Sequence, residues 1–152
     1  MQRKITQIFI YSACLLLLAT AMAKLVSSKG SARILAELDP IFAIPFREEF
    51  LFVALIELAV ALACAFIRRP WLQAGLLAWL GTSFLVYRCG LWWVGYQKPC
   101  SCLGNLTDAL HISPQTANTA MKIILAYLLI GSYATLLSLW LRKEASPGCP
   151  VI

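Results

Sequence analysis

Four long apolar runs, separated by short polar stretches, dominate the pattern of hydrophobic and polar residues along the chain. About 20 apolar residues cross a bilayer, and each run approaches or reaches that length. Because lipid cannot satisfy backbone polar groups, such runs are expected to be helical. The pattern therefore predicts an all-α, polytopic membrane protein, a four-transmembrane-helix bundle. Its spans are expected at about 5–26, 49–67, 71–93 and 115–141.

Two connecting segments carry structural signals of their own. Residues 34–46 include several apolar side chains, which predicts a short amphipathic helix on the membrane or on the bundle, broken at Pro40 and Pro45. Ser113 followed by Pro114 is typical of a helix N-terminus, so the last helix is expected to begin near Pro114.

The chain is expected to form a single domain over residues 1–145, followed by a flexible tail at 146–152. Its N-terminus also fits a signal peptide, because Arg3 and Lys4 precede an apolar run that ends in an Ala-x-Ala sequence. That run is long for a signal sequence, so we expect residues 1–23 to be retained as a helix.

Composition narrows the class of protein. Of the 152 residues, 61% are hydrophobic and 13% are charged, whereas soluble domains carry about 25% charged residues. This excludes an ordinary soluble enzyme, a disordered chain and a disulfide-stapled mini-domain. The net charge of +6 is scattered in pairs, so no nucleic-acid partner is expected.

The distribution of charge predicts the orientation of the helices. Six Lys or Arg and one acidic residue lie in the short segments 1–4, 68–70 and 142–152. Four Lys or Arg and five acidic residues lie in the longer segments 27–49 and 89–121. The positive-inside rule then places both termini in the cytoplasm and the two longer loops outside. We expect a bacterial-type inner (plasma) membrane protein.

The clearest chemical signal lies in the second outer loop, where Cys100 and Cys102 are separated by one residue. A disulfide across this spacing requires a tight turn near the limit of allowed geometry, and a strained disulfide exchanges easily. A reversible redox pair, a structural or incidental pair, and metal ligation all remain open. Metal is least favoured, because a site needs three or four ligands and only Cys89 and His111 are further outward candidates.

The other cysteines are expected to differ by depth. Cys14 and Cys64 lie within apolar runs and are expected to behave as small hydrophobic residues. Cys149 falls in the cytoplasmic tail. Cys89 lies at the outer end of the third helix, where it either packs or acts as a resolving thiol for the pair.

Charged residues near the membrane form a second signal. Glu57 is expected eight residues into a helix that enters from outside, and intramembrane carboxylates are costly unless paired or functional. Lys24, Arg88 and Lys122 end or begin apolar runs at the same side. An ion pair of Glu57 with Lys24 or Arg88 is expected, and the surplus cations would favour the thiolate form of the cysteines.

Four segments together resemble the MauE/DoxX-like family of redox-associated membrane proteins, named after methylamine utilisation. They are Ala23-Lys24, Leu-Ile-Glu-Leu-Ala at 55–59, Tyr-Arg-Cys-Gly at 87–90 and Pro-Cys-Ser-Cys-Leu-Gly at 99–104. The resemblance implies a four-helix membrane bundle that supports disulfide formation or thiol redox maturation of exported proteins. It also implies a periplasmic thioredoxin-like protein or an exported client as partner.

The sequence thus favours a thiol–disulfide exchange protein, an oxidoreductase or an accessory to one, with Cys100 and Cys102 as the redox pair. Lys24, Glu57 and Arg88 would supply electrostatic support. No cofactor is predicted, and quinone coupling stays open because Cys-x-Cys differs from the Cys-x-x-Cys of better understood four-helix thiol oxidases. Two alternatives remain: a non-catalytic assembly or scaffold subunit, and a small transporter or quinone-associated subunit centred on Glu57.

Overall fold

The computed structural model describes residues 2–29, 35, 38–95 and 113–145. Four long helices account for most of these residues, as the apolar pattern predicted. They are α1 (Gln2–Ser28), α2 (Phe46–Phe66), α3 (Pro70–Trp93) and α5 (Pro114–Ala145). All four are long and apolar enough to cross a membrane, so the chain is a multi-pass membrane protein.

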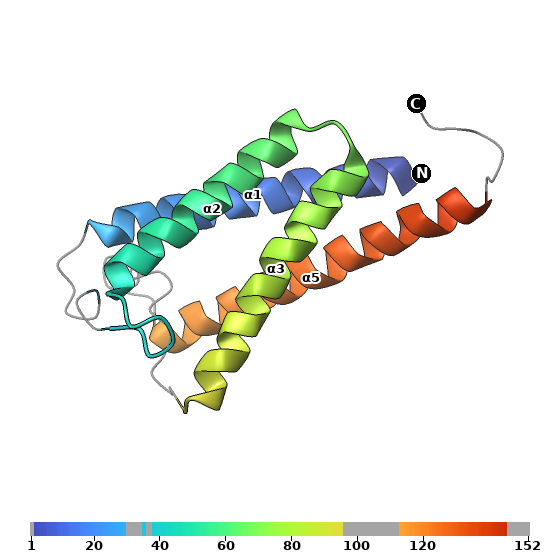
Figure 1. Ribbon diagram of the computed structural model, residues 1–152. Coiled ribbons are helices and arrows are strands. Elements are labelled where there is room, and N and C mark those ends of the chain that lie inside the picture. The colour runs from blue at the N-terminus through green and yellow to red at the C-terminus, as the bar shows by residue number, and fades with distance from the viewer. Residues whose placement is uncertain (1, 30–34, 36–37, 96–112, 146–152) are drawn as a thin grey trace.

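The helices alternate in direction, so their connections gather at two opposite ends (Figure 1). The short link from α2 to α3 lies at the end that also holds the N-terminus and the end of α5. The ends of α1 and α3, and the starts of α2 and α5, lie at the opposite end, which we call the polar end because Asp39 and Glu49 lie there (Figure 1).

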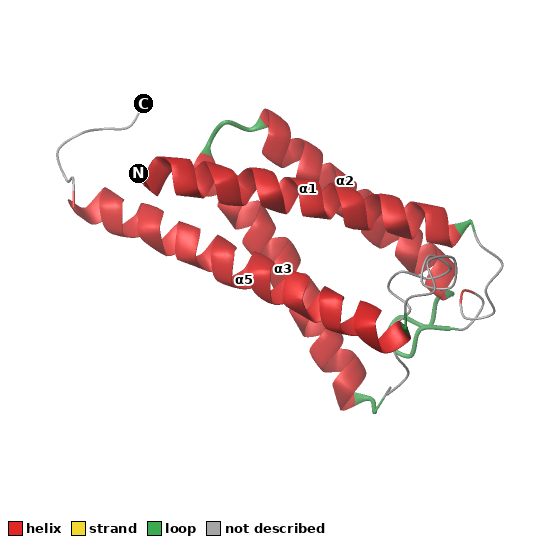
Figure 2. Ribbon diagram, turned by 180° about the vertical axis from the view of Figure 1, so that it is seen from behind, coloured by secondary structure: helices red, strands yellow, loops and turns green. Residues whose placement is uncertain are grey.

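The bundle consists of two helix pairs. Helix α1 packs along α2, and α3 crosses α5, whereas contacts between the pairs are fewer (Figures 1 and 2). The α1–α2 pair is antiparallel, because Cys14 contacts Cys64 at one level and Lys24 contacts Glu57 further along.

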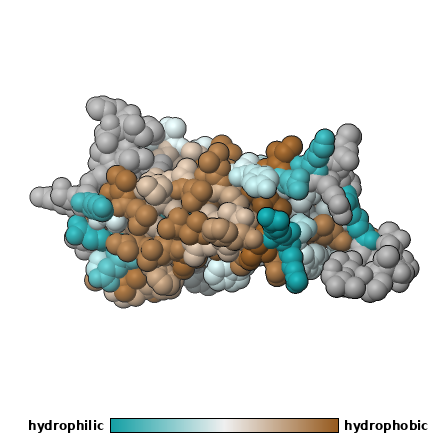
Figure 3. All heavy atoms as spheres, turned by 90° about the horizontal axis from the view of Figure 1, so that it is seen from above, coloured by the Kyte–Doolittle hydropathy of each residue, from teal (hydrophilic) through white to brown (hydrophobic). Residues whose placement is uncertain are grey.

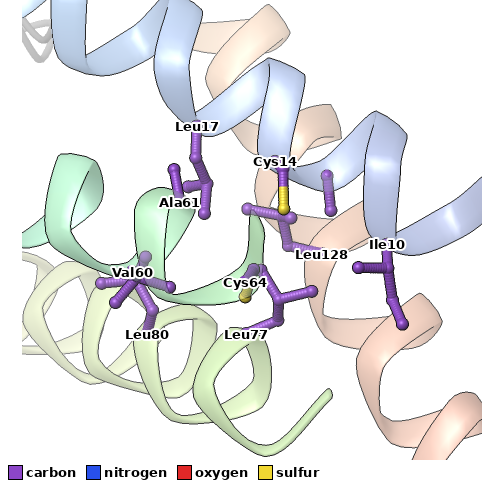
Figure 4. Close-up of a cluster of buried hydrophobic side chains, with 10 residues drawn as sticks. Ile10, Cys14, Leu17, Val60, Ala61, Cys64, Leu77, Leu80 and Leu128 are labelled. Carbon is purple, nitrogen blue, oxygen red and sulfur yellow. The ribbon is translucent and has the colours of Figure 1, made fainter. Parts of the chain in front are cut away.

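The core lies where the two pairs meet. Buried side chains from all four helices interlock there, including Leu17 from α1, Cys64 from α2, Leu77 from α3 and Leu128 from α5 (Figure 4). Large apolar side chains also cover the outside of the bundle, and hydrophobic residues fill the middle of the face in Figure 3, with hydrophilic ones toward the ends. This inverted surface suits lipid.

Local signals explain where two helices begin. Ser113 caps α5, because its Oγ accepts a hydrogen bond from the backbone N–H of Thr116 at 3.2 Å. Pro114 follows as the first helical residue, as predicted. Pro70 plays the same part in α3.

The short helix expected after α1 does not extend through residues 38–45, where breaks at Pro40 and Pro45 were predicted, and of its earlier part the structure describes only Leu35, in a 3₁₀ turn. Residues 38–45 instead form a closed turn, which we call the cap turn, held by a bridge between Leu38 and Pro45. The Asp39 carboxylate accepts the backbone N–H groups of Ile41 and Phe42 at 2.6 and 2.8 Å. These bonds compete with helix formation.

Candidate functional site

A buried ion pair joins the first two helices. Lys24 Nζ donates to Glu57 Oε1, and Thr20 Oγ1 donates to Glu57 Oε2 at 3.2 Å. The side chains of Lys24 and Glu57 are 7% and 2% exposed, and Lys24 also lies over the Phe84 ring at 5.4 Å. A charge pair this deeply buried persists only when each partner is compensated, and here both are.

Glu57 lies deeper along its helix than the sequence indicated. Helix α2 begins at Phe46, so Glu57 follows the helix start by about 16 Å at ~1.5 Å per residue. The carboxylate therefore lies near the middle of α2 rather than eight residues in. Sequence boundaries missed the extra turn because Arg47, Glu48 and Glu49 read as loop residues.

Of the two partners that the sequence left open for Glu57, the structure selects Lys24. Arg88 instead donates from Nη2 to Asn118 Oδ1 at 2.9 Å, which links the last turns of α3 to the start of α5. Lys122 is exposed on α5. Arg88 therefore retains its positive charge beside a neutral partner at the polar end.

A second polar cluster holds the cap turn against α3. The Tyr87 hydroxyl donates to Asp39 Oδ2, and the Tyr87 ring stacks on Phe42 with centroids 5.9 Å apart. Burial disfavours the Asp39 carboxylate, but the hydrogen bonds from Tyr87 and the N–H groups of Phe42 and Ile41 outweigh it and lower the pKa of Asp39 below its ordinary value.

A cavity of about 400 Å³ lies between these clusters. All four helices and the cap turn contribute to its wall, with Phe42 and Ile44 from the turn. Most of the wall is apolar, and the charged residues Lys24, Glu49 and Arg88 line it together with Glu57. The cavity is therefore amphipathic, with a few charged groups in an apolar wall.

The structure describes three of the six cysteines. Cys100 and Cys102 lie outside the described residues, so their part in a site stays a prediction. Cys14 and Cys64 are buried in the core with free thiols, and Cys89 is free and exposed near the end of α3. Among the described residues, no three His, Cys, Asp or Glu side chains come together as metal ligands do.

Sequence reasoning missed three members of this region: Asp39, Glu49 and Tyr87. Asp39 and Glu49 were counted as outer-loop charges, yet they are 1% and 7% exposed. The available signal was an aspartate directly before Pro40, because Asp side chains commonly accept backbone N–H groups in turns. Tyr87 directly precedes Arg88 but was given no role.

A family model described as "Methylamine utilisation protein MauE" matches residues 2–141, nearly the whole chain. The chain belongs to the MauE family. This confirms the MauE part of the resemblance seen in the sequence and associates the protein with methylamine utilisation at the membrane. No curated protein and no solved structure matches the chain significantly.

Proposed function

We propose that this MauE-family protein is a membrane thiol–disulfide exchange protein that supports disulfide maturation of exported proteins. Cys100 and Cys102 form the reversible pair. The partner is a periplasmic thioredoxin-like protein or an exported client, which meets the pair on the outer side of the membrane.

The observation that carries this proposal is the Arg88–Asn118 hydrogen bond at the polar end. Arg88 lies five residues before the end of α3 at Trp93, and Asn118 lies one turn into α5. The bond thus ties together the two helix ends that bracket residues 96–112. A Cys-x-Cys sequence tethered at both sides to a rigid support is suited to repeated opening and closing of one disulfide.

Charge at this end supports the same chemistry. Lys24 is neutralised by Glu57, but Arg88 bonds to a neutral amide and keeps its charge. A nearby cation favours thiolate, the reactive form of cysteine. Cys89 adjoins Arg88 with a free, exposed thiol, which makes it available as a resolving cysteine.

The exchange proceeds in two balanced steps. A client thiolate attacks one sulfur of the Cys100–Cys102 disulfide, forming a mixed disulfide and releasing the other cysteine as a thiolate. The client's second thiolate then attacks the mixed disulfide and releases the remaining cysteine. The client leaves with a new disulfide, and the two electrons stay on Cys100 and Cys102 as thiols.

The test is the redox state of the cysteines in glutathione buffers of graded potential, read by acid quenching and a maleimide mass tag. We expect two thiols to interconvert together with one disulfide, and the single variants C100S and C102S each to abolish the transition. C149S, in the predicted cytoplasmic tail, is the matched control and should keep it. If Cys100 and Cys102 stay in one redox state throughout, the proposal fails.

The same reagent tests the side of the membrane. In right-side-out vesicles an impermeant maleimide should reach reduced Cys100 and Cys102, whereas Cys149 should react in inverted vesicles. The two alternatives predict different mutational patterns. A scaffold subunit keeps its function in the C100S/C102S variant, and a transporter centred on Glu57 loses its function in E57Q while tolerating both serines.

A further inference from the structure

Two exposed residues of the lining indicate that the amphipathic cavity opens to the outside of the bundle. Phe52 on α2 and Trp79 on α3 both line it and are 64% and 57% exposed. Phe52 and Trp79 lie on membrane-spanning segments that belong to different helix pairs. Contacts between the two pairs are fewer than contacts within each pair. A molecule that enters between them therefore comes from the bilayer, so it must be lipid-soluble.

One carboxyl oxygen inside this cavity lacks a partner. Glu49 is 7% exposed and lines the cavity. Its carboxyl group interacts with Tyr87 and Asp39, yet its Oε2 has no hydrogen-bond partner in the described part of the chain. A buried polar atom left unsatisfied costs about 1–3 kcal/mol. This oxygen is therefore available to bond to the polar head of a ligand in the cavity.

The wall limits the chemistry of that head group. Aromatic rings of Phe46, Phe50 and Phe84 line the cavity, and such rings favour contact with a flat ring. At Glu49, an anionic head, as in a fatty acid or phospholipid, is disfavoured because Glu57 already neutralises Lys24 and an ionised Glu49 would repel it. The remaining cation of the lining, Arg88, already donates to Asn118. A neutral ring that bears oxygen atoms can pack against these aromatic side chains and is not repelled by Glu49.

We propose that the cavity binds a quinone of the bilayer, with an oxygen of its ring at Glu49 Oε2 and its apolar tail leaving between Phe52 and Trp79. A quinone carbonyl accepts a hydrogen bond from a protonated Glu49, and a hydroquinone hydroxyl donates one to the carboxylate. One carboxyl group thus recognises both redox forms of the same ligand.

The role of the quinone rests on the proposed function. Each client oxidation leaves two thiols on Cys100 and Cys102. Their reoxidation forms one S–S bond and transfers two electrons and two protons to the quinone, which becomes hydroquinone. Glu49 lies where it can pass one of these protons to the ring oxygen.

The experiment measures binding of decylubiquinone to the C100S/C102S protein in lipid nanodiscs, by quenching of tryptophan fluorescence. Decylbenzene, a ring and tail without carbonyl groups, and oleate, an anionic chain, are the comparison ligands. We expect saturable binding of decylubiquinone alone. Equal binding of decylbenzene, or preferred binding of oleate, overturns the proposal.

Two neighbouring glutamates give a matched pair of variants. E49L removes the buried carboxyl group and should weaken decylubiquinone binding about tenfold, the loss expected for one hydrogen bond. E48L changes an exposed residue of the same helical turn and should leave binding unchanged. Equal affinity of the two variants overturns the assignment to Glu49.

A third variant does not depend on a buried position. Ser83 lines the cavity and is exposed on α3, so S83F should fill the opening and abolish binding while the helices stay folded and the number of tryptophans stays the same. Retained binding in S83F contradicts entry at this place. Because binding is measured without Cys100 and Cys102, its loss overturns the quinone site alone, and a failed thiol transition overturns the exchange function alone.

Discussion

The side chain of Glu57 is almost fully enclosed, and its two carboxylate oxygens are divided between Lys24 and Thr20. The pair therefore has an asymmetric effect on stability. Removing one partner leaves the other buried without compensation, whereas removing both leaves only a less polar helix contact. The contribution of this pair to stability therefore depends on the burial of both charges and not only on their mutual attraction.

A mutant cycle at this pair tests the asymmetry. We expect K24M and E57Q each to lower the free energy of unfolding by about 3–5 kcal/mol, and the double variant to cost less than either. Chemical unfolding in mixed micelles measures the four proteins. K122M, at an exposed lysine of α5, should change little. Additive single effects would contradict a coupled pair.

Asp39 gives the protein a dependence on pH. Its pKa lies below the ordinary value although burial opposes this, because Tyr87 and the N–H groups of Phe42 and Ile41 bond to the carboxylate. A lowered pKa in the folded state means that the stabilisation is present above the ordinary pKa and lost as pH falls through the folded value. Acid should therefore loosen the cap turn.

We expect hydrogen exchange at the N–H groups of Ile41 and Phe42 to accelerate as the pH falls below about 4, the ordinary pKa of an aspartate, after correction for intrinsic rates. D39N should exchange faster at neutral pH, by a loss of about 1–3 kcal/mol, and should lack the acid step. E48Q removes an exposed carboxyl group and should behave as the wild type. An acid step that persists in D39N would contradict this assignment.

At the scale of the helices, the sequence predicted which helices exist better than it predicted the residues at which they begin and end. Charge-free runs predicted four helices, and Ser113 with Pro114 predicted the start of α5. The cap turn could not be predicted, because its stability depends on Tyr87 from α3 reaching Asp39. Apolar side chains alone favoured a helix there, and a contact distant in sequence decided otherwise.

The close approach of α5 to α1 depends on Gly131. A Cβ atom there would lie 2.0 Å from Cε2 of Phe9, whose ring also packs on Tyr127 at 5.5 Å. G131A should therefore displace the Phe9 ring and lower the free energy of unfolding by about 1–3 kcal/mol.

Gly75 in α3 provides the control, since nothing lies within 4 Å of its Cβ position. G75A should raise stability by about 0.5–1 kcal/mol through helix propensity. Thermal unfolding in the same micelles compares the two variants. Adding F9L to G131A should recover part of the loss, and a G131A protein as stable as G75A would contradict the close contact.

For the whole molecule, the sequence located the charges but not their partners. Lys24 and Arg88 were both expected at the level of Glu57, and only the order of helices around the bundle separates them. Helices that are apolar on every side carry no stripe that identifies their neighbours, so the two helix pairs and the cavity between them could not be predicted. Orientation in the membrane stays a prediction from the lysine and arginine distribution.

The pairing of α1 with α2 has a consequence for biogenesis. Both members of the buried ion pair belong to a helical hairpin that precedes α3 and α5 in the chain, so Lys24 and Glu57 can neutralise each other before α3 and α5 enter the bilayer. An isolated charge in lipid would be costly at that stage. The hairpin thus enters as a nearly neutral unit, onto which the second helix pair assembles.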